Sequence, residues 1–222
     1  MIIGVSGQAG SGKDTIADFL VEDFAFCKVA LADPMKRFCK EVFNFSDKQL
    51  WGPSQFRNEE DKRYERPCQG ENKIQYLTPR YSLQQLGSDW GRDCYNDVWI
   101  DYAIRTAKRL VEAGMNEEMG VTYSAQTGID NGEWSLDELK PCSYKGVVIS
   151  DCRFRNELSA IKKAGGINIR VIRHDAGLKG EAATHCSETE MSEISDEIFD
   201  VVILNNGTLE DLREKVAKFI EL

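Results

Sequence analysis

Short apolar runs alternate with amphipathic stretches along the chain, and this alternation predicts an α/β protein. Apolar runs rich in β-branched residues predict strands over 2–5, 26–32, 146–150, 166–173 and 200–204. Apolar positions at helical spacing predict helices over 16–24, 35–43, 83–86, 98–114, 158–164 and 208–220. Strands and helices in this order are expected to form a sheet flanked by helices.

Two segments interrupt the alternation. Residues 46–79 are charged and lack clean periodicity, which predicts a mobile flap whose arginines close over a transferring group, with a solvated charged face as the alternative. Residues 115–144 contain three glycines and an Asn-Gly pair, which predicts a surface insertion built as a hairpin. Because 222 residues are long for one small domain and short for two, we expect a single domain over 1–222.

The glycine-rich stretch after the first strand has the residues of a phosphate-binding loop. Gly7, Gly12 and Lys13 have the G-x-x-x-x-G-K spacing, in which backbone N–H groups surround a phosphate and the lysine reaches its outer oxygens. Asp14 stands where Ser or Thr normally supplies a hydroxyl to Mg²⁺, and the nearest hydroxyl belongs to Thr15. Strand, loop and helix in this order aim free N–H groups at an anion. The predicted phosphate site comprises Gly7, Gly10, Ser11, Gly12, Lys13, Asp14 and Thr15.

Acidic residues follow two further predicted strands. Asp33 is either a ligand contact at the carboxyl end of a strand or the N-cap of the next helix. Asp151 follows the strand over 146–150, where a P-loop enzyme orders the water around its Mg²⁺. Because Arg153 and Arg155 crowd the same strand end, we favour a functional role for Asp151 over a helix cap.

The stretch 80–93 combines a helical face with hydrogen-bonding side chains. Two leucines at positions 83 and 86 anchor the helix, and amides suit the edge of a base. A guanidinium fork suits a monophosphate. The candidates for these contacts are Arg80, Gln84, Gln85, Ser88, Asp89 and Arg92.

The composition of the chain indicates which classes of partner and which cellular setting to expect. The net charge of −9 argues against an extended nucleic-acid surface, which needs clustered Lys and Arg. Seven cysteines without a C-x-x-C pair predict neither a disulfide framework nor a zinc site and favour a reducing cytosol. Because no leader and no run of about 18 apolar residues is seen, we expect a soluble, unprocessed protein without a membrane segment.

Five motifs, taken in order, resemble the deoxynucleoside monophosphate kinases of tailed bacteriophages. They are the loop ending in Lys-Asp-Thr at 13–15, Leu-Ala-Asp-Pro-Met-Lys at 31–36, Leu-Gln-Gln-Leu-Gly-Ser-Asp-Trp-Gly-Arg at 83–92 followed by Trp99, Asp-x-Arg-Phe-x-Asn-Glu at 151–157, and His-Cys-Ser-Glu at 185–188. The resemblance implies a P-loop nucleoside-monophosphate-kinase-like fold with a five-stranded parallel sheet flanked by helices. The Lys-Asp-Thr variant also occurs in that family, whereas Arg155 stands where the family has proline.

The resemblance further implies transfer of the ATP γ-phosphoryl group to a deoxynucleoside monophosphate for phage DNA precursor synthesis, in the host cytoplasm. We expect direct in-line transfer with ATP and Mg²⁺ as cofactors. The hypothesised catalytic residues are Lys13, Asp151, Arg153 and Arg92. The expected acceptor-binding residues are Asp33, Arg80, Gln84, Gln85, Ser88, Asp89, Arg92 and Arg153. The expected Mg²⁺ ligands are Thr15 or Asp14, with Asp151 ordering its water.

Three alternatives stay open. A kinase of another phosphorylated metabolite, of the dephospho-coenzyme A or phosphomevalonate type, would share the loop and the metal. A non-catalytic module would bind ATP only as a structural ligand. A nucleotide switch is disfavoured because no Asn-Lys-x-Asp segment occurs. The role of 115–144 and the question of a homodimer are also left open. The preferred base is left open too, because a few hydrogen bonds decide it.

Overall fold

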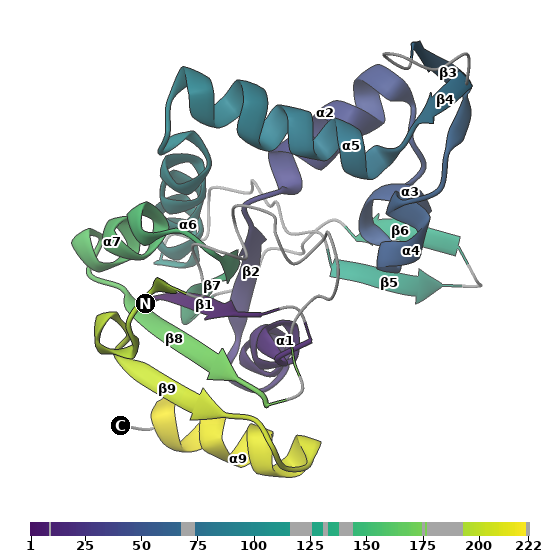
Figure 1. Ribbon diagram of the computed structural model, residues 1–222. Helices are drawn as coiled ribbons and strands as arrows, with labels where there is room; N and C mark the ends of the chain where they lie inside the picture. Colours follow the sequence, from purple (N-terminus) through teal and green to yellow (C-terminus); the bar gives the residue numbers. More distant parts are fainter. Residues whose placement is uncertain are drawn as a thin grey trace. The chain divides into compact units, whose positions relative to one another are not determined.

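The computed structural model describes residues 1–8, 10–67, 74–115, 126–130, 133–137, 144–174, 176 and 193–220. The chain divides into two compact units (Figure 1). The first comprises Met1–Leu31, Ile100–Ser124 and Leu139–Leu222, and the second comprises Ala32–Trp99 and Ala125–Glu138. A single functional domain over the whole chain stays a prediction.

The first unit is built on a parallel sheet. Its elements are β1 (Ile2–Gly7), α1 (Lys13–Phe24), β2 (Phe26–Ala30), α6 (Val98–Met115, which begins just before the unit), β7 (Gly146–Cys152), α7 (Arg155–Lys163), β8 (Ile167–Ile172), the 3₁₀-helix η3 (Asp196–Ile198), β9 (Val201–Leu204) and α9 (Leu209–Ile220). The strand order is β2-β7-β1-β8-β9, and every neighbouring pair is parallel. The predicted five-stranded parallel sheet is therefore confirmed.

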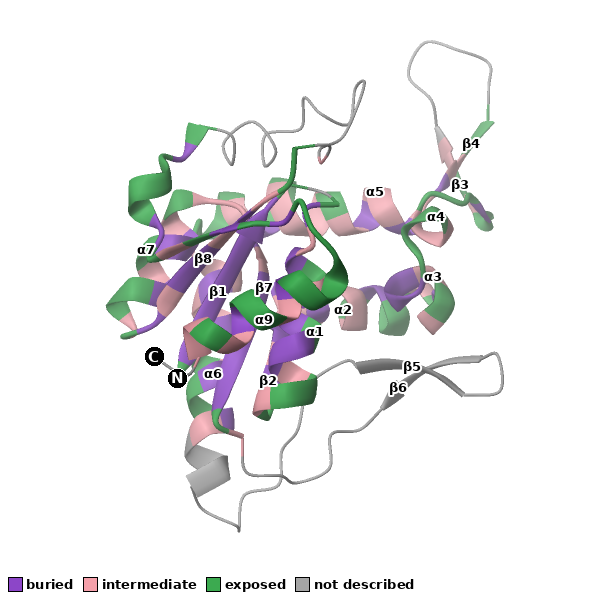
Figure 2. Cartoon of the chain, turned by 90° about the horizontal axis from the view of Figure 1, so that it is seen from below, coloured by how far each residue is buried: buried purple, intermediate pink, exposed green. Residues whose placement is uncertain are grey.

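β1 lies in the middle of this sheet, and all its residues are buried (Figure 2). The apolar faces of α1 and α9 form one core cluster with β1, β8 and β9, represented by Ile16, Leu20 and Leu212. α7 approaches the sheet at Gly4, where an added Cβ would come within 2.5 Å of Ile161 Cδ1. Because parallel strands end at one edge of a sheet, the loops after β1, β7, β8 and β9 emerge at the same edge.

The second unit has smaller elements around its own core. They are α2 (Asp33–Phe43), α3 (Asp47–Trp51), α4 (Ser54–Arg57), β3 (Asp61–Pro67), β4 (Ile74–Leu77), α5 (Pro79–Gln84), the π-helix η1 (Gln85–Arg92), β5 (Gln126–Asp130) and β6 (Glu133–Asp137). Cys39, Phe45, Leu50, Trp51 and Leu77 form its buried cluster. Leu83 and Leu86 pack against this cluster, as their helical spacing predicts.

Four local predictions have clear outcomes. The hairpin predicted within 115–144 is confirmed, because β5 and β6 pair antiparallel with Asp130 opposite Glu133. The helix predicted over 208–220 is confirmed as α9, and Thr208 caps it, since its Oγ1 accepts from Asp211 N at 3.2 Å. The prediction of Asp33 as an N-cap is wrong: Ala32 is the N-cap and Asp33 is the first helical residue. The strand predicted over 146–150 continues to Cys152, so Asp151 lies within its last residues.

The predicted flap over 46–79 contains α3, α4 and the antiparallel pair β3–β4, so its described part has regular structure despite its aperiodic sequence. Its mobility stays a prediction. Among the described residues, no helix is long and apolar enough to cross a membrane. The motif at 185–188 lies outside the described residues.

Candidate active site

The phosphate-binding loop follows β1 and leads directly into α1. Gly10 and Gly12 have φ of +79° and +99°, in the left-handed region where a side chain is strained. Gly7 is needed for space, because an added Cβ would lie 2.7 Å from the Val171 backbone oxygen. Backbone conformation and packing thus explain the glycines of the motif.

Lys13 begins α1 and is 7% exposed, although it carries a charge. Its Nζ lies 3.5 Å from Asp14 Oδ2 and 3.7 Å from Asp151 Oδ1. Buried charges need such partners, because an unpaired ammonium in a poorly solvated site is costly. The two carboxylates hold the ammonium beside the loop, where the helix N-terminus also favours an anion.

Asp151 is held in an unusual backbone conformation at the carboxyl end of β7. Its φ is +69°, and the pairing of β1 with β7 shifts there, from Val5 opposite Ser150 to Ser6 opposite Cys152. Asp151 is therefore the extra residue of a β-bulge, a feature common beside active sites. The Ser6 hydroxyl donates to the Cys152 backbone oxygen at 2.6 Å and joins the strands on the far side of the bulge.

The turn after Asp151 is tied to the start of α7. Arg153 Nε donates to Asp151 Oδ1 at 2.9 Å. The carboxylate of Glu157, 2% exposed, accepts from the backbone N–H groups of Arg153 at 2.7 Å and Phe154 at 3.1 Å. The sequence-predicted pair Asp151 and Arg153 is thus brought together, and Glu157 fixes the backbone that carries the arginine. Burial raises the pKa of the neighbouring Cys152 thiol, which keeps it protonated.

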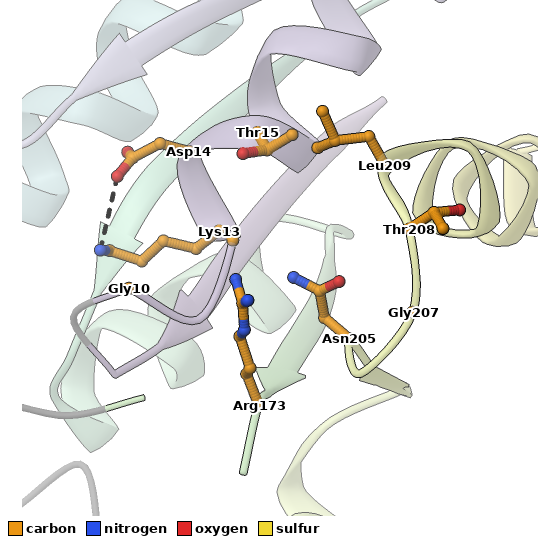
Figure 3. Close-up of a pocket in the computed structure, with 10 residues that line it drawn as sticks. Gly10, Lys13, Asp14, Thr15, Arg173, Asn205, Gly207, Thr208 and Leu209 are labelled. Carbon is orange, nitrogen blue, oxygen red and sulfur yellow. Dashed lines mark ion pairs between the residues drawn. The ribbon is translucent and has the colours of Figure 1, made fainter. Parts of the chain in front are cut away.

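A pocket of about 330 Å³ opens beside the loop (Figure 3). Gly10, Gly12, Lys13, Asp14, Thr15, Arg173, Asn205, Gly207, Thr208 and Leu209 line it. In Figure 3 the side chains of Arg173, just past β8, and Asn205, just past β9, both point toward the start of α1. Sequence reasoning missed this second wall. For Asn205 the signal was a polar residue directly after the strand predicted over 200–204, the same signal that identified Asp151.

Oxygen donors suited to Mg²⁺ lie around the loop. Thr15 and Asp14 both line the pocket, and Asp151 is paired with Lys13 beside it. Within the described part of the chain, no three His, Cys, Asp or Glu side chains form a metal cluster. That is compatible with Mg²⁺ bound to a nucleotide, because this ion keeps several waters and takes one or two protein ligands plus phosphate oxygens. The donor set therefore fits this ion.

The predicted acceptor residues lie in the second unit, except Arg153, which lies in the first. Asp33 begins α2, while Arg80 and Gln84 lie on α5; Gln85, Ser88, Asp89 and Arg92 lie on the π-helix η1. Arg80 Nη2 donates to Ser54 Oγ at 2.6 Å, and its Nε donates to Asn58 Oδ1. How this set is placed relative to the phosphate-binding loop stays a prediction.

The π-helix η1 is held by side chains of residues near it in the sequence. Trp99 Nε1 donates to the Gly87 backbone oxygen at 2.8 Å, and the ring occupies the space beside Gly91, where a Cβ would come within 2.4 Å. Gln85 Nε2 donates to Asp89 Oδ2 across one turn. π-Helical turns often occur at functional sites. Here the altered turn sets which polar side chains share a face.

The flap arginines have partners within their own unit. Arg57 Nη1 donates to the backbone oxygens of Leu50 and Gly52, both at 3.1 Å. Arg63 binds Asp61 through Nε at 2.8 Å, and this hydrogen bond is the main reason that the Asp61 pKa is lowered to about 2. The Arg66 guanidinium lies over the Tyr81 ring, 3.4 Å from its centroid. Because these arginines already bind groups within the second unit, the contacts favour a structural role for the charged stretch over the predicted closure of its arginines on a transferring group.

Three comparisons relate the chain to known proteins. The family model described as deoxynucleotide monophosphate kinase matches residues 1–69. A protein of Acanthamoeba polyphaga mimivirus assigned as a deoxynucleotide monophosphate kinase is 30% identical over 221 residues, covering 100% of this chain and 96% of that protein. The deoxynucleotide monophosphate kinase of Enterobacteria phage T4 is 24% identical, covering 100% of this chain and 99% of that protein. Among solved structures, the dephospho-CoA kinase of Campylobacter jejuni aligns at 14% identity with a TM-score of 0.48, covering 99% of this chain and 95% of that one.

Proposed function

This chain belongs to the deoxynucleotide monophosphate kinase family, and we propose that it transfers the γ-phosphoryl group of ATP to a deoxynucleoside 5′-monophosphate. The observation that carries the proposal is the buried Lys13, held by Asp151 3.7 Å away beside a glycine loop at a helix N-terminus. The phosphates of a phosphoryl donor are bound by this combination of backbone N–H groups and a lysine ammonium. The products are ADP and the deoxynucleoside diphosphate.

The donor phosphates would lie against the loop from Gly7 to Thr15. Lys13 would bridge the β- and γ-phosphates, since exchanging a carboxylate partner for phosphate keeps its charge compensated. The remainder of ATP would lie along the pocket wall formed by Arg173, Asn205, Gly207, Thr208 and Leu209. Thr15 or Asp14 would hold Mg²⁺, with Asp151 orienting its water; the ion would supply charge neutralisation at the transferring group.

The acceptor would be recognised by residues of the second unit. Gln84, Gln85, Ser88 and Asp89, with Asp33, would contact the base and sugar, and Arg80 and Arg92 would contact phosphate. Arg153, which belongs to the first unit, is the further candidate for a phosphate contact. In the in-line step, an acceptor phosphate oxygen forms a bond to the γ-phosphorus, and the bond between the γ-phosphorus and the β,γ-bridging oxygen breaks. The protein contributes position and charge, and no covalent intermediate is needed.

An ADP-release assay tests the proposal directly. Wild-type protein would be assayed with ATP, Mg²⁺ and dAMP, dGMP, dCMP, dTMP or modified pyrimidine monophosphates, with dephospho-coenzyme A as a different acceptor. We expect turnover with at least one deoxynucleotide. In Lys13→Ala, activity should fall about 1,000-fold or more because the transition-state charge loses its lysine.

Exposed Lys218 on α9 supplies the matched control, since Lys218→Ala removes the same side chain away from the loop and should keep full activity. Both variants should unfold at the wild-type temperature within a few degrees. Near-normal turnover in Lys13→Ala would contradict the assignment. Transfer to dephospho-coenzyme A alone would favour the other metabolite kinases, and ATP binding without transfer would favour the non-catalytic module.

The cellular setting follows from the substrate. Because deoxynucleotide pools are cytoplasmic, we place the reaction in the cytoplasm, in the host cell if the gene is viral. The acidic net charge of −9 supports a small-molecule partner over an extended nucleic acid. Light scattering would decide between a monomer and a homodimer.

A further inference from the structure

Asn205 joins two walls of the pocket that are far apart in sequence. Its side-chain Nδ2 donates to the Ser11 backbone oxygen at 2.8 Å, across 194 residues. Ser11 is 1% exposed and Asn205 is 8% exposed, so the bond is shielded from water. The approach is close, because a Cβ on Gly12 would lie 2.4 Å from the same nitrogen.

The position of Asn205 is set by the sheet. Its backbone N–H donates to the Ile172 backbone oxygen at 2.7 Å, which continues the β8–β9 pairing for one more residue. The chain then turns, and Gly207, Thr208 and Leu209, the first residue of α9, line the pocket. Asn205 is therefore anchored on the rigid sheet edge while its amide reaches the phosphate-binding loop.

This hydrogen bond also orients the peptide between Ser11 and Gly12. A peptide unit is planar and trans, so a fixed Ser11 carbonyl fixes the Gly12 N–H in the opposite direction. That N–H belongs to the predicted phosphate cradle, and it comes directly before Lys13. Hydrogen-bond donors that are already ordered bind an anion without the entropic cost of ordering.

We infer that Asn205 is a positioning residue for the donor nucleotide, holding the Ser11–Gly12 peptide in its phosphate-binding orientation. The inference rests on the proposed function only for the identity of that nucleotide as ATP. Asn205 and the following residue, Asn206, therefore have different roles. Asn206 is exposed, and its Oδ1 accepts from His174 N at 3.2 Å instead of contacting the loop.

The two asparagines provide a matched test. Asn205→Asp keeps the size of the side chain but replaces the donor with a carboxylate, which repels the Ser11 carbonyl. Asn206→Asp makes the same chemical change one residue later. Asn205→Ala removes the donor without adding charge and serves as the deciding variant if Asn205→Asp does not fold. Circular dichroism melting of each protein establishes that it is folded.

Calorimetric titration would measure the Kd for ATP and, separately, for dAMP, dGMP, dCMP and dTMP. We expect the Kd for ATP to rise at least tenfold in Asn205→Asp and about fivefold in Asn205→Ala. The Kd for the monophosphates should stay within twofold, and Asn206→Asp should stay within twofold for both ligands. A purely structural role would weaken both ligand classes equally.

Wild-type affinity for ATP in a folded Asn205 variant, an equal loss for both classes of ligand, or an equal effect of Asn206→Asp would overturn the inference. Because the readout is binding, it is separable from the proposed reaction. A wild-type protein that binds ATP but transfers nothing would refute the kinase proposal and still show whether Asn205 positions the loop.

Discussion

The phosphate-binding loop and the π-helix η1 are supported in opposite ways. The loop at 7–15 is held by residues far along the chain: Asn205 bonds Ser11, Asp151 pairs with Lys13, and Val171 limits the space at Gly7. The helix is held by near neighbours, through Gln85 with Asp89 and Gly87 with Trp99. The loop is therefore expected to depend on the integrity of the sheet, and the helix on its own side chains.

Apart from Lys13→Ala, the largest effect is expected where distant support and chemistry coincide. Asp151→Asn keeps the side-chain shape, and asparagine tolerates a φ of +69° well, but the charge facing Lys13 and Arg153 is lost. We expect kcat to fall about 100-fold, because both cations lose the partner that orients them. Steady-state kinetics at saturating ATP and acceptor would measure this change.

Asp18→Asn is the control for that variant. Asp18 is an exposed carboxylate on α1 that pairs with Lys28 and does not face the pocket, so its loss should leave kcat within twofold. A kcat for Asp151→Asn within threefold of the wild type would show that the bulge positions the backbone and that its carboxylate is dispensable.

A smaller effect is expected at the locally supported helix. Trp99→Phe keeps an aromatic ring beside Gly91 but removes the donor to the Gly87 oxygen. One lost hydrogen bond costs about 1 kcal/mol in the free energy of unfolding. If η1 presents the acceptor site, the KM for the monophosphate should rise several-fold while the KM for ATP stays unchanged, the reverse of the Asn205 result.

Urea denaturation and two-substrate kinetics would test that prediction, with Trp90→Phe as the stability control. Trp90 lies on η1 itself and is 59% exposed, so its replacement should leave the free energy of unfolding unchanged. An unchanged KM for every monophosphate in Trp99→Phe would contradict the placement of the acceptor site on this helix.

The smallest effect concerns the pH dependence of the second unit. Asp61 is 8% exposed, and its pKa is lowered from 3.8 to about 2, mainly by the Arg63 hydrogen bond, with Gln49 helping. Because the folded-state pKa lies below the unfolded one, the carboxylate stabilises the fold above about pH 4, and this contribution is lost as the pH falls toward 2.

Asp61→Asn should therefore be less stable than the wild type by about 1 kcal/mol at pH 7. The difference should shrink below pH 4, because Asp61 of the unfolded chain binds a proton there while the folded carboxylate stays ionised until about pH 2. Urea unfolding across this range would measure it, and catalysis at pH 7 should be unaffected in the folded variant. A constant difference from pH 7 to 3 would contradict the assigned pKa shift.

The alternation of apolar and polar positions was sufficient to predict five strands and most flanking helices, and the family resemblance implied that the strands are parallel. Buried runs such as 146–150 and the helical spacing of Leu83 and Leu86 are local signals of packing. The same approach failed for one of the two interpretations of Asp33, the N-cap, because aspartate is favoured both at the N-cap and in the first turn of a helix. It also found no regular structure in 46–79, where ion pairs stabilise short elements that carry little periodicity.

By itself, the sequence determined the chemistry of the loop, because the spacing of Gly7, Gly12 and Lys13 is a property of one short backbone segment. It also carried the family relationship through motifs in a shared order. The tertiary structure alone decided that Asp151 sits in a bulge and that Asn205 reaches Ser11 while Asn206 does not. Those outcomes depend on the register of β1, β7, β8 and β9, which is set by the packing of the whole sheet and not by any local pattern.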